Sequence, residues 1–313
     1  MATMKAVRLE SFGGPETLRI VEIERPQPRD DEVLVEVHAA SVNPVDYKIR
    51  SGKYPPIKQE NLPIVLGRDL SGVVVARGAA VATLLDGDEV MAMLDRGSGS
   101  YAEYVALRAD LCMRKPELLD HGEAAAVPLA GITAWQGLFE HGGLAAAQRV
   151  LIHGGAGGVG HFAVQFAKAR DAYVITTCAG KDKDFVRSLG ADEAIDYRAE
   201  RFEDVVNEVD LVFDLVGGDT QERSWAVLKD GGTLVSTLAK PSERQAQIHE
   251  ARAMSYVAHP DAAQLGEIVH LITEKKVRPH VDARFPLAQV AAAHEKLEHG
   301  HPRGKIVLEV RSG

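Results

Sequence analysis

Long apolar runs, cysteine pairs and basic clusters are scarce in this chain of 313 residues, and each absence excludes a class of protein. No apolar run approaches the roughly 18 residues that a membrane-spanning helix needs. Two cysteines, Cys112 and Cys178, are too few for a disulfide framework or a four-cysteine zinc site. The formal net charge is −9 and the basic residues are scattered, which argues against nucleic-acid binding. The start, MATMKAVRLESFG, lacks a basic segment followed by an apolar one, so we expect a cytoplasmic protein with no membrane or nucleic-acid partner.

Two regions of the chain differ in their periodicity. Residues 4 to about 110 contain short β-type runs separated by turn clusters such as FGGPE, RPQPRDD and DRGSGS, which predicts an antiparallel, barrel-like region. From about residue 123, short apolar strands alternate with amphipathic helices, which predicts a parallel sheet with right-handed crossovers. The last strand, GKIVLEV, has no obvious place in that sheet. We therefore expect one domain of residues 1–122 and 266–313, and a dinucleotide-binding domain of residues 123–265.

A glycine-rich loop, HGGAGGVG at residues 153–160, follows an apolar strand and opens an amphipathic helix. In the fingerprint G-x-G-x-x-G, Gly155 is expected to permit the tight turn, Gly157 to let the backbone approach a pyrophosphate, and Gly160 to let the helix pack on the strand. The helix N-terminus then offers free N–H groups to the phosphate. A merely flexible glycine turn is the alternative. The candidate cofactor-binding residues of the loop are Gly155, Gly157, Gly158, Val159 and Gly160.

The end of the second strand of the parallel region bears on which dinucleotide binds. In NAD-binding proteins an acidic side chain there accepts hydrogen bonds from the ribose. Residues 176–183 read TTCAGKDK, with no carboxylate on the strand end and with Lys181 and Lys183 just beyond it. The pattern favours NADP, because lysines can neutralise a 2′-phosphate. Asp182 leaves NAD open, and a solvated helix start is the alternative role of the two lysines.

Ordered motifs extend over nearly the whole chain, among them SVNPVDYKIRSGKYP, LPIVLGRDLSGVV, GSYAEYVAL, PLAGITAWQGL, the glycine loop, SLGADEAIDY, VFDLVGG, GGTLVS and RGKIVLEV. Together they resemble the medium-chain dehydrogenase/reductase superfamily, and within it the zinc-independent quinone oxidoreductase and alkenal reductase branch. The resemblance implies an α/β fold: a Rossmann-type doubly wound parallel sheet plus a strand-rich GroES-like catalytic domain, with the cofactor in the cleft between them. It also implies a homodimer, in which the segment AMSYVA would pair an otherwise open sheet edge.

The zinc-ligand positions of the related alcohol dehydrogenases are changed in this chain. Asn43 stands where those enzymes carry a cysteine, Gly67-Arg68-Asp69 stands where they carry Gly-His-Glu, and the third position falls in PLAGIT, which has no ligand. The resemblance therefore implies a metal-free site. Without a Lewis acid the acceptor must itself be activated, as a quinone or an α,β-unsaturated carbonyl is. When hydride adds to such an acceptor, negative charge develops on its enolate or hydroquinone oxygen, and hydrogen-bond donors can stabilise that charge.

The resemblance also suggests individual site residues, each with a structural alternative. The candidate donors to substrate are Asn43, Tyr47, Arg50 and Tyr54. The implied cofactor contacts are Asn43 near the nicotinamide ribose, Thr133 near the nicotinamide end, Tyr197 near the adenosine phosphate, and Val216 and Leu238 beside the nicotinamide ring; Lys181 is a candidate from the charge pattern above. Asp214 is expected to orient backbone locally, and Arg303-Gly304-Lys305 either to reach a cofactor phosphate or to cap the final strand.

These observations predict an NADPH-dependent oxidoreductase that transfers hydride to a quinone or α,β-unsaturated carbonyl without zinc. Two other functions stay open. One is a zinc-less NAD(P)-dependent alcohol dehydrogenase that has kept the fold. The other is a non-catalytic NADPH-binding sensor or structural protein, because a fold does not fix a function.

Overall fold

Contacts within the chain divide it into two compact units. A computed structural model describes residues 2–311. Unit 1 contains the residues up to Leu129, Pro260–Thr273 and the residues from Pro279 onward, and unit 2 contains Ala130–His259 and Glu274–Arg278. Each unit is described by itself below.

Unit 1 is built on two sheets. The strands are β1 (Thr3–Leu9), β2 (Leu18–Glu24), β3 (Glu32–Val42), β4 (Ile64–Val65), β5 (Asp69–Arg77), β6 (Glu89–Met93), β7 (Tyr104–Arg108), β8 (Cys112–Arg114), β15 (Val281–Pro286) and β16 (Lys305–Glu309). A small sheet has the order β2-β1-β4, and the larger one has the order β15-β16-β3-β5-β6-β8, with β7 paired to β3. The last strand, β16, runs antiparallel to β3, with Ile306 opposite Val42. The return of the final strand to the first region, expected from the sequence, is confirmed.

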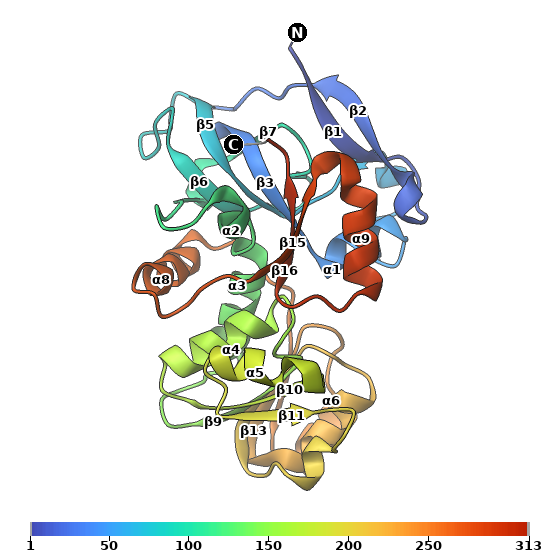
Figure 1. The fold of residues 1–313 in the computed structure, drawn as a ribbon, viewed down its shortest axis with the longest axis vertical. Coiled ribbons are helices and arrows are strands. Elements are labelled where there is room, and N and C mark those ends of the chain that lie inside the picture. The colour runs from blue at the N-terminus through green and yellow to red at the C-terminus, as the bar shows by residue number, and fades with distance from the viewer. Residues whose placement is uncertain (1, 312–313) are drawn as a thin grey trace. The chain divides into compact units, whose positions relative to one another are not determined.

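The helices of unit 1 are α1 (Pro44–Arg50), α2 (His121–Ala125), α8 (Ala262–Thr273) and α9 (Val290–His299). Figure 1 shows α9 beside β15 and β16, against which it packs. The domain boundary predicted between residues 265 and 266 falls inside α8. This helix lies in unit 1, where it packs against β8, because its buried face of Leu265, Ile268 and Ile272 needs a partner surface.

Helix α1 begins where β3 ends, and its sequence explains the change. Asn43 is the N-cap, Pro44 occupies the first helical position, and the Asp46 carboxylate accepts a 2.8 Å hydrogen bond from the backbone N–H of Asn43. Asp46, Ile49 and Arg50 are buried, whereas Tyr47 is half-buried. The first turn of α1 therefore holds polar side chains against the interior of unit 1.

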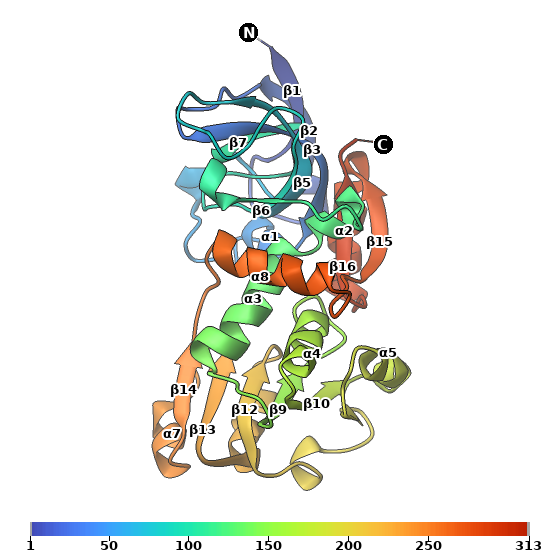
Figure 2. The ribbon, with the colours of Figure 1, turned by 90° about the vertical axis from the view of Figure 1, so that its left-hand side faces the viewer.

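Unit 2 is a doubly wound parallel sheet, as the sequence predicts. Its strands are β9 (Arg149–His153), β10 (Tyr173–Cys178), β11 (Glu193–Asp196), β12 (Val209–Asp214), β13 (Leu228–Ser236) and β14 (Arg252–Ser255). Its helices are α4 (Gly160–Ala169), α5 (Lys183–Ser188), α6 (Asp219–Arg223) and α7 (Glu243–Ile248). The strand order is β11-β10-β9-β12-β13-β14, and Figure 2 shows this sequence of strands from β10 to β14. The order reverses at β9, which is where ligands bind in open α/β sheets.

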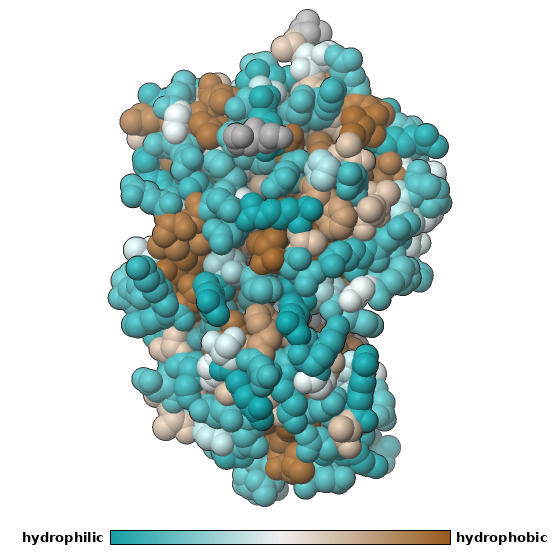
Figure 3. All heavy atoms as spheres, viewed as in Figure 1, coloured by the Kyte–Doolittle hydropathy of each residue, from teal (hydrophilic) through white to brown (hydrophobic). Residues whose placement is uncertain are grey.

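Helix α3 (Pro128–Trp135) spans the residues at which the chain passes from unit 1 into unit 2. Among residues 2–311, no helix is both long enough and apolar enough to cross a membrane. On the face drawn in Figure 3, hydrophilic residues predominate and the apolar ones form separate patches.

Candidate functional site

The glycine loop leaves β9 through a left-handed turn. Gly154 has φ +77°, and its N–H donates to the Thr177 carbonyl at 3.1 Å. The tight turn is therefore made by Gly154, and the role predicted for Gly155 was wrong. Gly155 is required for another reason: a Cβ there would lie 2.1 Å from Oγ1 of Thr176 on the neighbouring strand β10.

The other two glycines of the fingerprint have distinct surroundings. A Cβ on Gly160 would lie 2.2 Å from the carbonyl oxygen of Gly154, so only glycine lets α4 start this close to β9. A Cβ on Gly157 would have one neighbour within 4 Å, that same oxygen at a close 3.3 Å, and without a side chain the loop backbone is left uncovered at this position. Among the described residues, the N–H groups of Gly158 and Val159 donate to no protein acceptor. These are the features that a pyrophosphate at a helix N-terminus requires.

His153, the last residue of β9, is buried beneath the loop. Ser224 Oγ donates to the Thr220 carbonyl and lies 2.9 Å from His153 Nε2, so Nε2 carries the proton. His153 Nδ1 then accepts from the Thr177 hydroxyl, whose oxygen is 3.1 Å away. The same oxygen accepts from the Gly154 N–H at 3.2 Å. Burial lowers the pKa of His153 to about 4. The neutral imidazole thus braces the loop rather than serving as an exposed base.

This histidine makes the protein sensitive to acid. Because its folded-state pKa, about 4, lies below the ordinary value of 6.5, the unfolded chain binds more protons between these pH values. Its contribution is complete above pH 6.5 and is lost as the pH falls to about 4, for a total of about 3 kcal/mol. We expect urea unfolding to show a shallower pH dependence for His153→Asn than for the wild type between pH 7 and pH 4.5. Equal slopes for the two proteins would refute this assignment.

Apolar side chains lie beside the glycine loop, beyond the ends of β12 and β13. Val216 and Leu238 are 51% and 47% exposed, which is unusual for large aliphatic residues. The Gly154 Cβ position is 3.5 Å from Val216 Cγ2, and the Gly217 Cβ position is 3.2 Å from Leu238 Cδ1. The structure thus brings these two predicted residues together with the loop, as an apolar platform at the carboxyl edge of the sheet.

Asp214 holds this platform in place. It is fully buried, and its carboxylate accepts from the backbone N–H groups of Val216 (3.0 Å) and Gly217 (2.8 Å), from Gln221 Nε2 (2.9 Å) and from Ser236 Oγ (2.8 Å). Four donors satisfy the charge without a counter-ion. The geometry matches the local backbone role expected for Asp214.

The segments that follow β10 and β11 carry both positive and negative side chains. Lys181 is exposed at the turn after β10, whereas Lys183 pairs with Glu200 at 3.4 Å and Asp182 is buried, at 5% exposure. Tyr197 is 55% exposed, and the Arg198 guanidinium lies 5.5 Å from the centre of its ring. Sequence reasoning missed Arg198, although it directly follows the motif that contains Tyr197.

Sequence reasoning also missed a carboxylate at this end. A Cβ on Gly180 would lie 2.3 Å from Asp196 Oδ2, so the Asp196 side chain, at the end of β11, lies against the turn that carries Lys181. Its Oδ1 accepts from the Arg198 N–H at 3.0 Å. A neighbouring strand therefore supplies an acidic group that β10 itself lacks.

Thr133 lies on α3 and is 9% exposed. Its carbonyl accepts a hydrogen bond from the hydroxyl of Tyr256, which follows β14. Gln136, one turn further on, binds the backbone of His259 in both directions, at 3.0 and 3.2 Å. These contacts fix the start of the unit 2 chain to the segment that follows the last strand of its sheet.

The predicted residue Asn43 belongs to a buried polar network in unit 1. Its Nδ2 donates to Asp69 Oδ2 at 2.8 Å, and its Oδ1 accepts from the Lys305 ammonium. Ser41 Oγ donates to the same Asp69 oxygen, and Asp69 Oδ1 accepts from the Leu129 N–H at 2.6 Å. Asn43 is 2% exposed. Its amide is thus largely committed to protein partners.

The second carboxylate of this network is Asp46. Its Oδ2 accepts from the Tyr101 hydroxyl at 3.0 Å, and burial raises its pKa to about 6. Burial also lowers the pKa of Lys305, against the opposing pull of Asp69 and Asp46. The expectation that Lys305 reaches a phosphate or caps a strand is not what the geometry gives, because its ammonium points into this network.

The polar groups of the other predicted donors differ in whether protein partners already bind them. Arg50 is 2% exposed and binds Glu298 of α9 at 2.7 Å and the Gly13 carbonyl at 3.2 Å, which ties it into the protein interior. Tyr54 packs at the edge of the apolar core of unit 1. Tyr47 is half-buried, and burial and the charge of Glu298 raise its pKa, which keeps its hydroxyl protonated.

Comparison with known proteins defines the family. The model of the alcohol dehydrogenase GroES-like domain matches residues 29–117, and that of the zinc-binding dehydrogenase matches residues 189–308. A chloroplastic NADPH-dependent alkenal/one oxidoreductase of Arabidopsis thaliana is 37% identical over 97% of this chain and 79% of its own. The chain belongs to the medium-chain dehydrogenase/reductase superfamily, in its quinone oxidoreductase and alkenal reductase branch.

Solved structures of this superfamily agree with the fold. The quinone oxidoreductase of Coxiella burnetii has a TM-score of 0.92 and 38% identity, with 99% of this chain and all of that one covered. An NAD-dependent alcohol dehydrogenase has a TM-score of 0.91 and 30% identity, with 98% of this chain and all of that one covered. Within the superfamily the similarity therefore extends to proteins named for different acceptors.

The residues that stand at the zinc-ligand positions suit a metal poorly. The Asn43 oxygen is bound to an ammonium, and Arg68 is a cation whose guanidinium donates to the Leu94 carbonyl at 3.1 and 2.7 Å. Between residues 2 and 311, no group of three or more His, Cys, Asp or Glu side chains is arranged to hold a metal ion.

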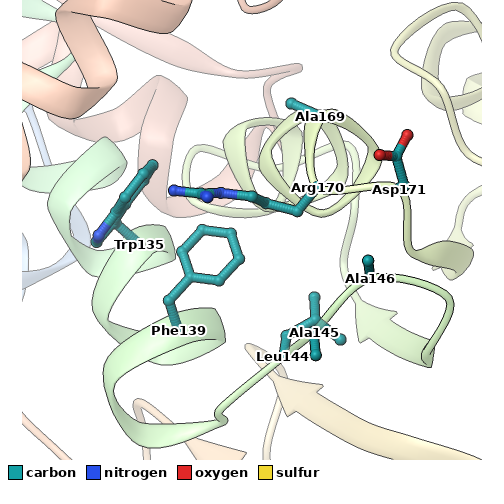
Figure 4. A pocket seen from close by; sticks show the side chains of 8 residues that line it. All are labelled: Trp135, Phe139, Leu144, Ala145, Ala146, Ala169, Arg170 and Asp171. Carbon is teal, nitrogen blue, oxygen red and sulfur yellow. The ribbon is translucent and has the colours of Figure 1, made fainter.

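A hollow in unit 2 lies far from the glycine loop. Figure 4 shows the Arg170 side chain beside Trp135 and Phe139, with its guanidinium 5.5 Å from each ring centre. The lining also includes residues 144–146, which precede β9, and residues 169–171, which end α4. These positions lie at the amino end of β9, whereas the glycine loop follows its carboxyl end. The hollow is therefore not the dinucleotide site.

Proposed function

We propose that this chain is an NADPH-dependent reductase that transfers hydride to a quinone or an α,β-unsaturated carbonyl compound. The observation that carries the proposal is the glycine loop, which has no side chain over its backbone at Gly157, N–H groups at Gly158 and Val159 that donate to no acceptor within residues 2–311, and the Val216–Leu238 platform beside it. Bound NADPH would supply the hydride. The loop would hold the pyrophosphate, and the platform offers an apolar face to the nicotinamide ring. The names of the alkenal/one and quinone oxidoreductase relatives support the acceptor class.

The preference for NADPH over NADH rests on the charges at the adenosine end. Lys181 and Arg198 are exposed there and suit a 2′-phosphate, and Tyr197 offers a ring face to the adenosine. Asp182 is buried, which weakens the argument for NAD that the sequence left open. Asp196 opposes the preference, because a carboxylate beside Gly180 repels a phosphate and suits a free ribose hydroxyl. Two cations against one carboxylate favour NADPH.

Replacing Lys181 with glutamate is expected to raise the Kd for NADPH about tenfold or more and to change the Kd for NADH by less than about threefold. The physical reason is that only NADPH carries the phosphate that the new carboxylate repels. Isothermal titration calorimetry of each nucleotide measures both constants. Lys276→Glu, an exposed lysine of the same unit, is the matched control and should change neither. Equal losses for the two nucleotides would remove Lys181 from the phosphate site.

We assign the reaction no zinc, because the side chains at the ligand positions are an amide bound to lysine and an arginine. A conjugated acceptor then needs only a hydrogen-bond donor at its oxygen. Of the four candidates we favour Tyr47 as the donor, since its hydroxyl is protonated and has no hydrogen-bond partner within residues 2–311. Tyr54 is the second candidate. Asn43 and Arg50 hold other side chains in place through their buried contacts and do not donate to the acceptor. The second lone pair of the Asn43 oxygen is left to accept from a ribose hydroxyl.

The acceptor class is tested by following NADPH absorbance with a small quinone, an enone and an unactivated ketone. The proposal predicts oxidation with the first two only. Comparable turnover of the unactivated ketone would favour the alcohol dehydrogenase alternative. The structural similarity to an NAD-dependent alcohol dehydrogenase is the observation that supports this alternative. NADPH binding without turnover of any acceptor would favour a sensor or structural protein.

Assembly and location remain predictions. β14 is the outer strand of its sheet, and Met254 within it and Val257 just after it are 37% and 66% exposed, which suits pairing with a second copy of the chain. We propose a homodimer on this basis. We also propose a cytoplasmic location, although the alkenal/one oxidoreductase relative is chloroplastic.

A further inference from the structure

The buried network of unit 1 contains one cation among several acceptors. The Lys305 side chain is 3% exposed, and its ammonium donates to Asn43 Oδ1 and, at 3.2 Å, to the Val42 carbonyl. The strand register explains the contact: because Ile306 of β16 lies opposite Val42 of β3, Lys305 lies opposite Asn43. A buried ammonium is expensive unless it is paired and hydrogen-bonded. The buried ammonium therefore depends on these acceptors and in turn fixes their orientation.

The two ends of the Asn43 amide are held by groups of opposite charge. Lys305 can only donate and therefore requires the amide oxygen, whereas the Asp69 carboxylate accepts and therefore requires the amide nitrogen. A flipped amide would place its NH₂ group against the ammonium and its oxygen against the carboxylate. The network therefore allows a single orientation of the amide.

We propose that Lys305 is a positioning residue for cofactor binding, which it fixes through the orientation of the Asn43 amide. This inference rests on the proposed contact of Asn43 with the nicotinamide ribose. Lys305 occupies one lone pair of Oδ1, and the other lone pair is left as an acceptor for a hydroxyl group. Asp69 extends the same restraint, because its other oxygen binds the Leu129 N–H in the first turn of α3.

A double-mutant cycle on the full chain separates positioning from general stability. The Kd for NADPH is measured for the wild type, Asn43→Ala, Lys305→Met and the double variant. Each single change is expected to raise Kd roughly tenfold, and the double variant to be no weaker than Asn43→Ala alone, because Lys305 acts through that amide. Multiplying effects would show that Lys305 acts independently of Asn43, and would overturn the proposal.

Three further variants keep the cycle interpretable. Lys115→Met removes another buried ammonium of unit 1, which pairs with Glu89 at 3.0 Å, and should leave the Kd for NADPH unchanged even where it lowers stability. If Lys305→Met fails to fold, Lys305→Gln is measured instead: its amide can still donate to Asn43, so the positioning role predicts an affinity for NADPH close to that of the wild type, and a tenfold loss would contradict it. In Lys305→Ala, which removes the stem together with the ammonium, rescue of NADPH affinity by added propylammonium, and not by tetramethylammonium, would support a positioning role for the ammonium.

Failure of this inference is distinguishable from failure of the proposed function. If Asn43→Ala binds NADPH as tightly as the wild type, the ribose contact and the positioning role are both wrong, while binding through the glycine loop and turnover of conjugated acceptors stand. If the wild type binds no NADPH, the proposed function itself fails.

Discussion

Replacing Gly157 with aspartate is expected to weaken NADPH binding by at least about a hundredfold and to lower the stability of the protein less than Gly160→Ala does. The Cβ position of residue 157 has one close neighbour, the Gly154 oxygen at 3.3 Å, and Gly157 does not adopt a left-handed conformation, so a shift of a few tenths of an ångström accommodates the side chain. It would place a negative charge where the pyrophosphate approaches, and like charges at a binding surface cost several kcal/mol. Calorimetric titration and thermal unfolding measure the two quantities.

Gly160→Ala is the informative comparison for this prediction. Its Cβ would lie 2.2 Å from the Gly154 oxygen, so it should lower both stability and binding, because the start of α4 must move away from β9. Gly157→Asp that still binds NADPH with wild-type affinity would show that the pyrophosphate does not lie over this loop.

Asp214→Ala is expected to destabilise the protein by about 3–5 kcal/mol, the range found when one member of a buried charged network is removed. The substitution leaves two backbone N–H groups, Gln221 and Ser236 without their acceptor in the interior of unit 2. Urea unfolding gives the loss. Asp219→Ala is the control, since that side chain is 84% exposed and pairs only at the surface with Arg223. A loss below about 1 kcal/mol for Asp214→Ala would contradict the importance of its four hydrogen bonds.

The features that the sequence predicted well are those written in local patterns. The alternation of short apolar strands and amphipathic helices specified the parallel sheet of unit 2, and the surplus final strand pointed to its pairing with β3. The spacing of the glycines located the loop. Val216 and Leu238, which the family resemblance suggested, lie beyond the ends of β12 and β13, where ligands bind in such sheets, and their contact with the cofactor stays a prediction.

What the sequence could not supply are contacts between residues distant in the chain. Lys305 meets Asn43 from 262 positions away, and Arg50 meets Glu298 from 248 positions away. Such pairs depend on the register of β16 and on the packing of α9, which no local pattern encodes. Donor residues chosen from one motif segment therefore included Arg50 and Asn43, whose polar groups the structure commits largely to the protein interior. The assignment of the tight turn to Gly155 failed for a related reason, since the turn is set by hydrogen bonds to Thr177 on the neighbouring strand.

The most direct test of hydride transfer to a conjugated acceptor uses NADPH carrying deuterium at C4 of the nicotinamide. The two stereospecifically labelled forms are incubated separately with the protein and an enone, and the product is examined by mass spectrometry and NMR. The account predicts that one of the two forms delivers a single deuterium to the β-carbon of a saturated ketone. Deuterium on the carbonyl carbon of an allylic alcohol, or no transfer from either form, would contradict it.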